Sequence, residues 1–295
     1  MTTQPMFTDL PLPQLSIPTD IEFFQEAVEA LPVCIAYCQC PDRWHTLWAG
    51  LKATGLLRGV HAQAPFLREA LKPHWVKGGN ILIAGAADTG SLDVLSALYG
   101  DTTARYTVVD RCEAPLSLVA RRAEARHLHV KTVLADLDAM EAMEPWDLVF
   151  IHYTLSFMDH AARMRVFRKL KDTLAPQGVI VCALRYVETP ATRDDPNAAA
   201  EWLAATAATL RVTYAGHPEL LASLIEWLPV YARARMERER LMPHATVVRD
   251  ELAAAGFKIL SEHDNPGQTA SGKRDLPRQG AMQSRFLMVG HTDRG

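Results

Sequence analysis

The 295-residue sequence contains no long hydrophobic run and no strong excess of charge of either sign. No stretch approaches the roughly 20 consecutive apolar residues that a transmembrane helix needs. The N-terminus also lacks the charged start and apolar core of a secretory signal. A formal net charge of -3 provides no basic surface of the kind that nucleic-acid-binding domains present. We therefore expect a cytoplasmic protein that binds neither membranes nor nucleic acid.

Cysteine is also scarce, with five residues in the whole chain. An odd number without a secretory signal suits a reducing compartment better than a disulfide framework. Cys34, Cys38 and Cys40, followed by His45, form the one cluster that could suggest a metal. Its C-x-x-x-C-x-C spacing is not the paired C-x-x-C of structural zinc sites. Because cysteine behaves as a small buried hydrophobe, we expect core packing here and no metal.

The composition is that of an ordinary globular protein, with 48% hydrophobic and 22% charged residues. Residues 1–19 contain four prolines and no sustained periodicity, which predicts a flexible arm. From Asp20, which we expect to be an N-cap, apolar residues recur at helical spacing. Further helices are predicted over 44–57 and 64–75. Residues 20–79 are therefore predicted to form an N-terminal helical cap.

From residue 80 the pattern alternates between short apolar runs and helices. Strands are predicted at 81–84, 106–109, 131–135, 146–151 and 179–183, with helices at 91–99, 114–126 and 159–174. Uniformly apolar strands separated by helices indicate a parallel sheet covered on both faces. The alternation then stops, and the segment 197–244 is helical in pattern. A helix at 247–255 and strands at 257–261 and 285–290 complete a single domain over 80–295.

Small or acidic residues follow the first three predicted strands, where ligands bind in a doubly wound sheet. Gly85-Ala86-Ala87-Asp88-Thr89-Gly90 follows the first strand, and small residues there allow a ligand to approach the backbone. Asp110 follows the second strand and could accept hydrogen bonds from a ribose diol. Asp136 and Leu137 follow the third and could contact an adenine. A tight turn or a helix cap explains any one of these residues, so the signal is their combination.

In this order the motifs resemble those of the class I (Rossmann-like) methyltransferases, which use S-adenosylmethionine (SAM). Ile81 to Ala87 looks like the glycine-rich first motif, Val108-Val109-Asp110 like the acidic second, and Leu134 to Leu137 like the third. Trp146 to His152 is similar to the family's fourth strand, and Leu174 to Gly178 to its turn before strand five.

The resemblance implies an α/β fold with a doubly wound, seven-stranded, mostly parallel sheet, an N-terminal helical cap and a helical insert after strand five. It also implies SAM as cofactor, with S-adenosylhomocysteine (SAH) as the product formed from it. The cofactor-binding residues that it implies are Gly85, Ala86, Ala87, Asp88, Gly90, Asp110, Arg111, Asp136, Leu137 and His152.

The first motif departs from the family pattern. The family usually has an acidic residue two positions before the first glycine, where this chain has Ile83. The second glycine of the loop is replaced by Ala87 or Asp88, depending on the alignment. We hypothesise that Asp88 supplies the missing carboxylate to the methionine ammonium of the cofactor.

Three alternatives to a methyltransferase remain open. The spacing Gly85-x-Ala87-x-x-Gly90, with an acid about 20 residues on, partly satisfies the fingerprint of an NAD(P)-binding oxidoreductase. The acid after the third strand has no role in that pattern. The altered first motif also leaves room for a non-catalytic SAM-binding scaffold, or for an enzyme that does other chemistry on the bound ligand.

Methyl transfer by direct displacement needs mainly alignment, because the sulfonium is already activated. His152 and Tyr153 follow the fourth strand and are candidates for a base or an acceptor contact. Arg185 and Tyr186, after the fifth strand, and Tyr231 in the insert are candidates for substrate binding, with packing as the alternative for each.

The sequence favours a small-molecule acceptor. The Asn/Asp-Pro-Pro-aromatic motif of amino methylation is absent, and His152-Tyr153-Thr154-Leu155 stands in its place. The insert and the N-terminal helices are expected to form a lid over the acceptor. Its aromatic residues are expected mainly in the core and its arginines on a solvated face; these are Trp202, Tyr214, Trp227, Tyr231, Arg233, Arg235, Arg238 and Arg240. The sequence does not distinguish a monomer from a homodimer.

Overall fold

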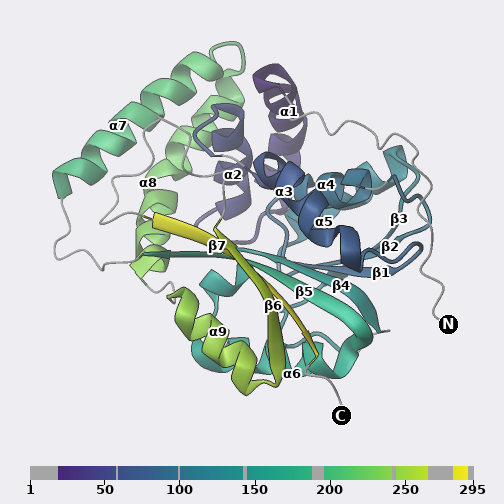
Figure 1. The fold of residues 1–295 in the computed structure, drawn as a ribbon. Coiled ribbons are helices and arrows are strands. Elements are labelled where there is room, and N and C mark those ends of the chain that lie inside the picture. The colour runs from purple at the N-terminus through teal and green to yellow at the C-terminus, as the bar shows by residue number, and fades with distance from the viewer. Residues whose placement is uncertain are drawn as a thin grey trace.

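The computed structural model describes residues 19–57, 59–98, 100–141, 145–187, 196–240, 244–264 and 282–291. Within these residues a seven-stranded sheet carries helices on both faces, and four more helices stand together beyond one end of it (Figure 1). The predicted flexible arm falls almost wholly on residues 1–18, which lie outside the described residues. None of the described helices is both long and apolar enough to cross a membrane.

The sheet has the strand order β3-β2-β1-β4-β5-β7-β6. Its strands are β1 (Asn80–Ala84), β2 (Arg105–Asp110), β3 (His129–Leu134), β4 (Trp146–His152), β5 (Leu174–Val187), β6 (Phe257–Asp264) and β7 (Met282–His291). The first five strands pair in parallel, whereas β7 is antiparallel to both β5 and β6. The predicted doubly wound, seven-stranded, mostly parallel fold is therefore confirmed. The inserted antiparallel strand distinguishes it from the 3-2-1-4-5-6 order of dinucleotide-binding folds.

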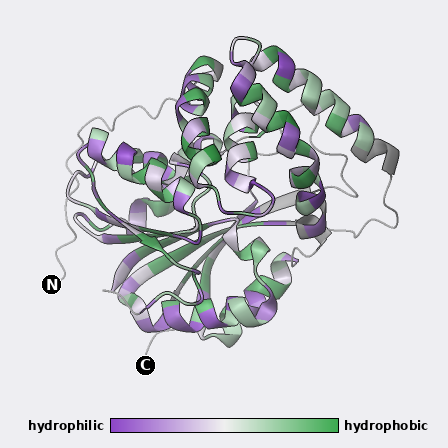
Figure 2. Cartoon of the chain, turned by 180° about the vertical axis from the view of Figure 1, so that it is seen from behind, coloured by the Kyte–Doolittle hydropathy of each residue, from purple (hydrophilic) through white to green (hydrophobic). Residues whose placement is uncertain are grey.

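Alternation along the strands builds two separate cores, because successive side chains of a strand point to opposite faces. Ile83, Val108 and Phe150 belong to one core, and their chain neighbours Ala84, Val109 and Ile151 belong to the other. Figure 2 shows hydrophobic residues along most of the central strands, while the helices carry both hydrophilic and hydrophobic residues.

The first face is covered by α3 (Ala64–Leu71), α4 (Gly90–Leu98) and α5 (Glu113–Ala125), with the short helices η1 (Val60–Gln63) and η2 (Lys72–His74). The second face is covered by α6 (His160–Thr173) and α9 (Ala245–Ala254). The short helix η3 (Thr154–Phe157) follows β4 directly. The segment 64–75, expected in the cap, thus lies against the sheet.

The remaining helices form a third core of their own. They are α1 (Asp20–Tyr37), α2 (Trp44–Ala53), α7 (Pro196–Thr213) and α8 (Pro218–Arg240). Trp202, Tyr214 and Tyr231 are buried among them, as expected for the aromatic residues of the insert. Helix α1 begins with a capping box between Thr19 and Glu22. Thr19 is therefore the N-cap and the prediction of Asp20 was wrong by one residue.

Candidate functional site

A cavity of about 410 Å³ lies beyond the carboxyl ends of β1, β2 and β4 and beneath α2 and α8. Its volume lies in the range of small-molecule sites. Most of the predicted site residues line it: Gly85, Ala86, Ala87, Asp88, Asp110, Arg111, Asp136, Leu137, His152, Tyr153 and Arg185. Gly90 and Tyr231 are not among its lining residues, and the side chain of Tyr186 lies outside the described part of the chain.

Gly85 turns the chain away from β1 in a conformation that requires glycine. Its φ is +86°, and a Cβ atom at this position would collide with the Thr154 side chain. The Gly85 N–H donates to Val109 O (2.8 Å), and Thr154 Oγ1 donates to Ala84 O (2.8 Å). The loop and η3 are therefore in close contact, and the first motif is fixed by packing within the protein.

Asp110 lies at the end of β2, where it joins two turns. Its Oδ2 accepts from Ala86 N (2.9 Å) and its Oδ1 accepts from Cys112 N (2.8 Å). Burial raises the pKa of Asp110, although its two backbone N–H donors oppose the shift. Since a carboxylate has about four acceptor sites, Asp110 can accept further hydrogen bonds from hydroxyl groups in the cavity.

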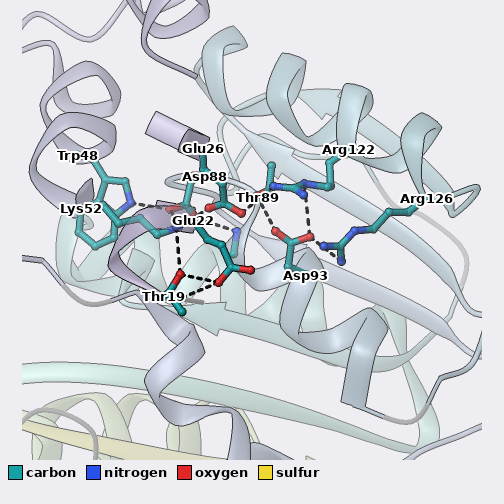
Figure 3. Close-up of polar contacts among 11 residues, drawn as sticks. Thr19, Glu22, Glu26, Trp48, Lys52, Asp88, Thr89, Asp93, Arg122 and Arg126 are labelled. Carbon is teal, nitrogen blue, oxygen red and sulfur yellow. Dashed lines mark hydrogen bonds and ion pairs between the residues drawn. The ribbon is translucent and has the colours of Figure 1, made fainter. Parts of the chain in front are cut away.

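Asp88 forms a buried ion pair with Lys52 of α2, a partner that the sequence did not predict (Figure 3). Asp88 Oδ2 accepts from Lys52 Nζ (2.9 Å) and Trp48 Nε1 (3.0 Å), and its Oδ1 accepts from Gly90 N (2.7 Å). Burial would raise the pKa of Asp88, but the charge of Lys52 and these hydrogen bonds hold it well below its usual range. The pKa of Lys52 is raised in turn, because Asp88 and Glu26 outweigh the effect of its burial.

This ion pair belongs to a chain of alternating charges that fastens the cap to the first face of the sheet (Figure 3). Lys52 Nζ lies 3.7 Å from Glu26 Oε2 on α1, and Arg122 on α5 contacts Glu26 Oε1 at 2.9 Å. Arg122 and Arg126 both contact Asp93 on α4, at 3.6 and 2.9 Å. The Gly85–Gly90 loop is therefore connected electrostatically to α1, α2, α4 and α5.

The side chains of His152 and Tyr153 both form hydrogen bonds with Gln63 of η1. The Gln63 amide nitrogen donates to Tyr153 Oη (2.9 Å), which leaves its oxygen to accept from His152 Nε2 (2.8 Å). The proton of the His152 imidazole is therefore on Nε2. Burial, with Arg185 nearby, lowers the pKa of His152 to about 3. The Arg185 guanidinium lies 4.4 Å from the centre of the Tyr153 ring.

Tyr153 adopts a conformation that is uncommon for a residue other than glycine. Its φ is +61°, in the left-handed region, at the start of η3. Its N–H donates to Ala183 O on β5 (3.0 Å) and its side chain is buried. Such conformations cost on the order of 1–3 kcal/mol and persist where the surroundings fix them. Tyr153 lines the cavity in this conformation.

Aromatic residues of α2 and η3 form a wall that the sequence motifs did not indicate. Trp44, Trp48 and Phe157 line the cavity. The Trp44 ring lies 5.3 Å from that of Phe157 and 5.2 Å from that of Tyr231, so Tyr231 supports the wall from behind. The spacing of Trp44 and Trp48, four residues apart on one helix face, is the signal that could have identified them.

Arg235 corrects the expectation of a solvated arginine face. Arg235 is only 4% exposed and lines the cavity. Arg233, two residues earlier, is exposed. Helix α8 contacts α1, α2 and η3, which turns the Arg235 side of the helix toward the site. The charge pattern of the insert alone could not reveal this, because it depends on where α8 packs.

The cysteine cluster is buried as expected, but its side chains also converge. The Sγ atoms of Cys38, Cys40 and Cys112 and Nδ1 of His45 all lie within 4.8 Å of one another. Cys112 directly precedes α5 and is distant in sequence from the other three. Cys34, expected with the cluster, is buried but does not contribute to it.

The sheet order is that of the class I SAM-dependent methyltransferase fold, and the strand-end residues of this sheet line one cavity. Residues 81–178 match the family model described as "Methyltransferase domain". SAM is the cofactor of this family. No curated protein matches the sequence.

Several solved structures share the fold. Geranyl diphosphate C-methyltransferase from Streptomyces coelicolor is 13% identical, with 87% of this chain and 88% of that chain covered and a TM-score of 0.55. An SAM-dependent methyltransferase from Clostridium acetobutylicum is 10% identical, with 82% and 95% covered and a TM-score of 0.51. The 1,6-didemethyltoxoflavin-N1-methyltransferase from Burkholderia thailandensis is 16% identical, with 79% of both chains covered and a TM-score of 0.50. At these identities the similarity shows the fold alone.

Proposed function

We propose that this protein transfers the methyl group of SAM to a small-molecule acceptor by direct displacement. The observation that carries the proposal is the cavity at the strand ends. The Gly85–Asp88 loop, Asp110, Asp136 and His152 line it together, although they come from four different parts of the chain. The sulfonium supplies an activated methyl group, so the protein has to orient the two reactants and exclude water.

Asp110 has the geometry expected of a ribose-binding carboxylate. Both of its oxygens are fixed by backbone N–H groups, so it does not need to reorganise when hydroxyl groups bind. Leu137 and Asp136 line the same cavity beyond β3. We assign the ribose to Asp110 and the adenine to Asp136 and Leu137.

We propose that Asp88 contacts the methionine ammonium of SAM while it keeps its ion pair with Lys52. Three donors occupy its two oxygens, and a carboxylate offers about four acceptor sites. The remaining site supports one further charged contact. Lys52 then has the role of keeping Asp88 ionised before the cofactor binds.

The acceptor side of the cavity combines aromatic surface with positive charge. Trp44 and Phe157 form an apolar wall, and Arg185 and Arg235 contribute two guanidinium groups to the lining. Aromatic walls favour flat or apolar groups, and guanidinium groups favour carboxylate or phosphate. We therefore propose an acceptor with an apolar, preferably aromatic, body and an anionic group.

His152 is better suited to contact a reactant than to act as a strong base. With its pKa lowered to about 3, the imidazole is neutral near pH 7 and accepts a proton weakly. Its Nε2–H is already fixed by Gln63. We propose that His152 and Tyr153 position the acceptor, whose own nucleophilic atom attacks the methyl group.

Calorimetry with SAM and SAH tests the cofactor site. Asp110→Asn should weaken SAM binding by about tenfold or more, because a charged hydrogen bond contributes about 1.5–3 kcal/mol. Asp172→Asn, an exposed carboxylate on α6, is the matched control and should bind normally. A wild-type protein that binds neither SAM nor SAH would refute the proposed function.

Asp88 needs a test that does not leave Lys52 unpaired. Lys52→Met is compared with the double variant Lys52→Met/Asp88→Asn, so that only the second lacks the carboxylate. If Asp88 binds the cofactor ammonium, SAM affinity falls about tenfold between the two variants. Equal affinities would remove Asp88 from the cofactor site.

Methyl-labelled SAM tests the acceptor class. Aromatic acceptors that carry a carboxylate or phosphate are compared with matched neutral ones. We expect label mainly in the anionic compounds, and Arg235→Met should abolish that preference. Label distributed equally in the wild type would contradict the anionic assignment, and cofactor binding without transfer to any acceptor would support a scaffold.

A further inference from the structure

Four potential metal ligands face one another where the helical cap meets the end of β2. His45 Nδ1 lies 3.7 Å from Cys38 Sγ and 3.6 Å from Cys40 Sγ. Cys112 Sγ completes the group, and the four atoms lie within 4.8 Å of one another. All four residues are buried, and none of the cysteines is in a disulfide.

The local fold holds these side chains in place. Cys38 ends α1 and Cys40 follows two residues later, while His45 is on the first turn of α2. Arg43 adopts a left-handed conformation between them, with φ of 50°, and its guanidinium donates to Cys38 O (2.5 Å). The loop therefore folds back so that three of the ligand atoms point to the same place.

Cys112 approaches from the opposite side, at the N-terminus of α5. Its N–H donates to Asp110 Oδ1 (2.8 Å), so the same turn carries the fourth sulfur and the proposed ribose carboxylate. A helix N-terminus favours negative charge, as on a thiolate. The cluster thus joins the α1–α2 loop to the strand end on which Asp110 lies.

We propose that Cys38, Cys40, His45 and Cys112 bind one Zn²⁺ ion, which fastens the helical cap to the cofactor site. Three thiolates and one imidazole form an established structural zinc ligand set. Tetrahedral coordination with those bond lengths places sulfur and nitrogen ligands about 3.6 Å apart and sulfur ligands about 3.8 Å apart. The two sulfur–nitrogen distances in the structure, 3.7 and 3.6 Å, agree with that spacing.

The ligand set indicates a structural role. Four protein ligands close the coordination sphere, whereas catalytic zinc keeps one position for water or substrate. Cys40 and His45 also line the cofactor cavity, so the ion would stabilise its wall without contacting the reacting atoms. The proposal reverses the sequence-based expectation that these cysteines pack in the core without a metal. The sequence pattern did not indicate the fourth ligand, because Cys112 is on a different element.

The test is metal analysis of the full-length protein, reduced and reconstituted with Zn²⁺ and then freed of unbound metal. We expect about one zinc per chain by mass spectrometry. Cys112→Ser should lose most of the zinc. Cys182→Ala, which removes a buried cysteine of β5 outside the cluster, should retain it. This readout does not depend on SAM binding or on methyl transfer.

Cobalt substitution provides a second measurement if Cys112→Ser fails to fold. Co²⁺ in the wild type should give the visible bands of a tetrahedral site and a thiolate-to-cobalt charge-transfer band. Cys112→His keeps four ligands, so it should retain the metal while the charge-transfer intensity falls by about one third, from three thiolates to two.

Three outcomes would overturn the proposal. One is a wild-type protein that retains no more zinc than Cys112→Ser. Another is an octahedral cobalt spectrum without the charge-transfer band. The third is the loss of two hydrogens from the mass of the protein as purified, with a disulfide mapped between cluster cysteines, which would identify a redox pair in place of a metal site.

Discussion

Replacement of Lys52 by methionine should destabilise the protein more than any change at an exposed lysine. The Lys52 side chain is 7% exposed and that of Asp88 is 19% exposed. Methionine keeps the packing volume against Phe23, whose ring lies 4.9 Å from Lys52 Nζ, but it removes the ammonium. The Asp88 carboxylate then remains buried, with only its N–H donors from Trp48 and Gly90.

Loss of one partner from a buried ion pair costs about 3–5 kcal/mol. Because Asp88 keeps two donors and some exposure, we expect the lower end, about 3 kcal/mol. For a chain of 295 residues this corresponds to a fall of about 5 °C in Tm. Lys52→Met/Asp88→Asn should recover more than half of the loss, since no uncompensated charge remains.

The loss should depend on pH in a defined direction. In the wild type the depressed pKa of Asp88 contributes stability above its unfolded value of about 3.9, and that contribution is lost as the pH falls through the folded value. In Lys52→Met, burial raises the pKa of Asp88, so acid stabilises the variant. The two stability curves should therefore converge below about pH 5.

Urea unfolding from neutral to acid pH measures this difference. Lys77→Met, at an exposed lysine before β1, is the matched control for the loss of one charge and should change stability by about 0.5 kcal/mol or less. A Lys52→Met variant as stable as this control, or a gap that widens in acid, would refute the reasoning.

Three further predictions concern other parts of the fold. Gly85→Ala should lower the free energy of unfolding in urea by about 2–4 kcal/mol, because φ of Gly85 is +86° and a Cβ there would collide with η3. Gly216→Ala, with open space around it, should be nearly neutral. Arg163→Ala should cost about 3–5 kcal/mol, because its bidentate pair with a glutamate of α9 is buried; the exposed pair of Arg165 should contribute less than about 1 kcal/mol. With the pKa of His152 at about 3, kcat/KM should show no acid limb from this residue between about pH 5 and 7, and a limb near pH 6 that is lost in His152→Gln would contradict that.

Local sequence patterns were enough to predict the strand-end residues. Gly85 and Asp110 come at the ends of apolar strands, and Asp136 comes after the more exposed edge strand β3. Parallel strands bring their carboxyl ends to one edge of the sheet. Their convergence on one cavity therefore follows from the alternation of strands and helices alone. Small errors remain in the predicted ends of elements, such as Asp20 in place of Thr19 as the N-cap. They arise because neighbouring residues can both serve as a helix cap.

The partners of those residues could not be predicted in the same way. Lys52 is 36 residues before Asp88, and Cys112 is 67 residues after His45, on a different element. No motif marks such pairs, because they depend on how α1 and α2 pack against α4 and α5. The position of Arg235 could not be predicted for the same reason. Only the packing of α8 decides whether this side chain lies in solvent or in the cavity.

The sequence by itself determined the order of strands and helices, the two faces of the sheet and the residues at its carboxyl edge, because periodicity and turn chemistry act over a few neighbouring residues. Only the tertiary structure decided what closes the site: the Lys52 partner of Asp88, the aromatic wall from Trp44 to Phe157, and the meeting of Cys112 with the α1–α2 loop. These depend on contacts between segments far apart in the chain, which the packing of the helical cap brings together.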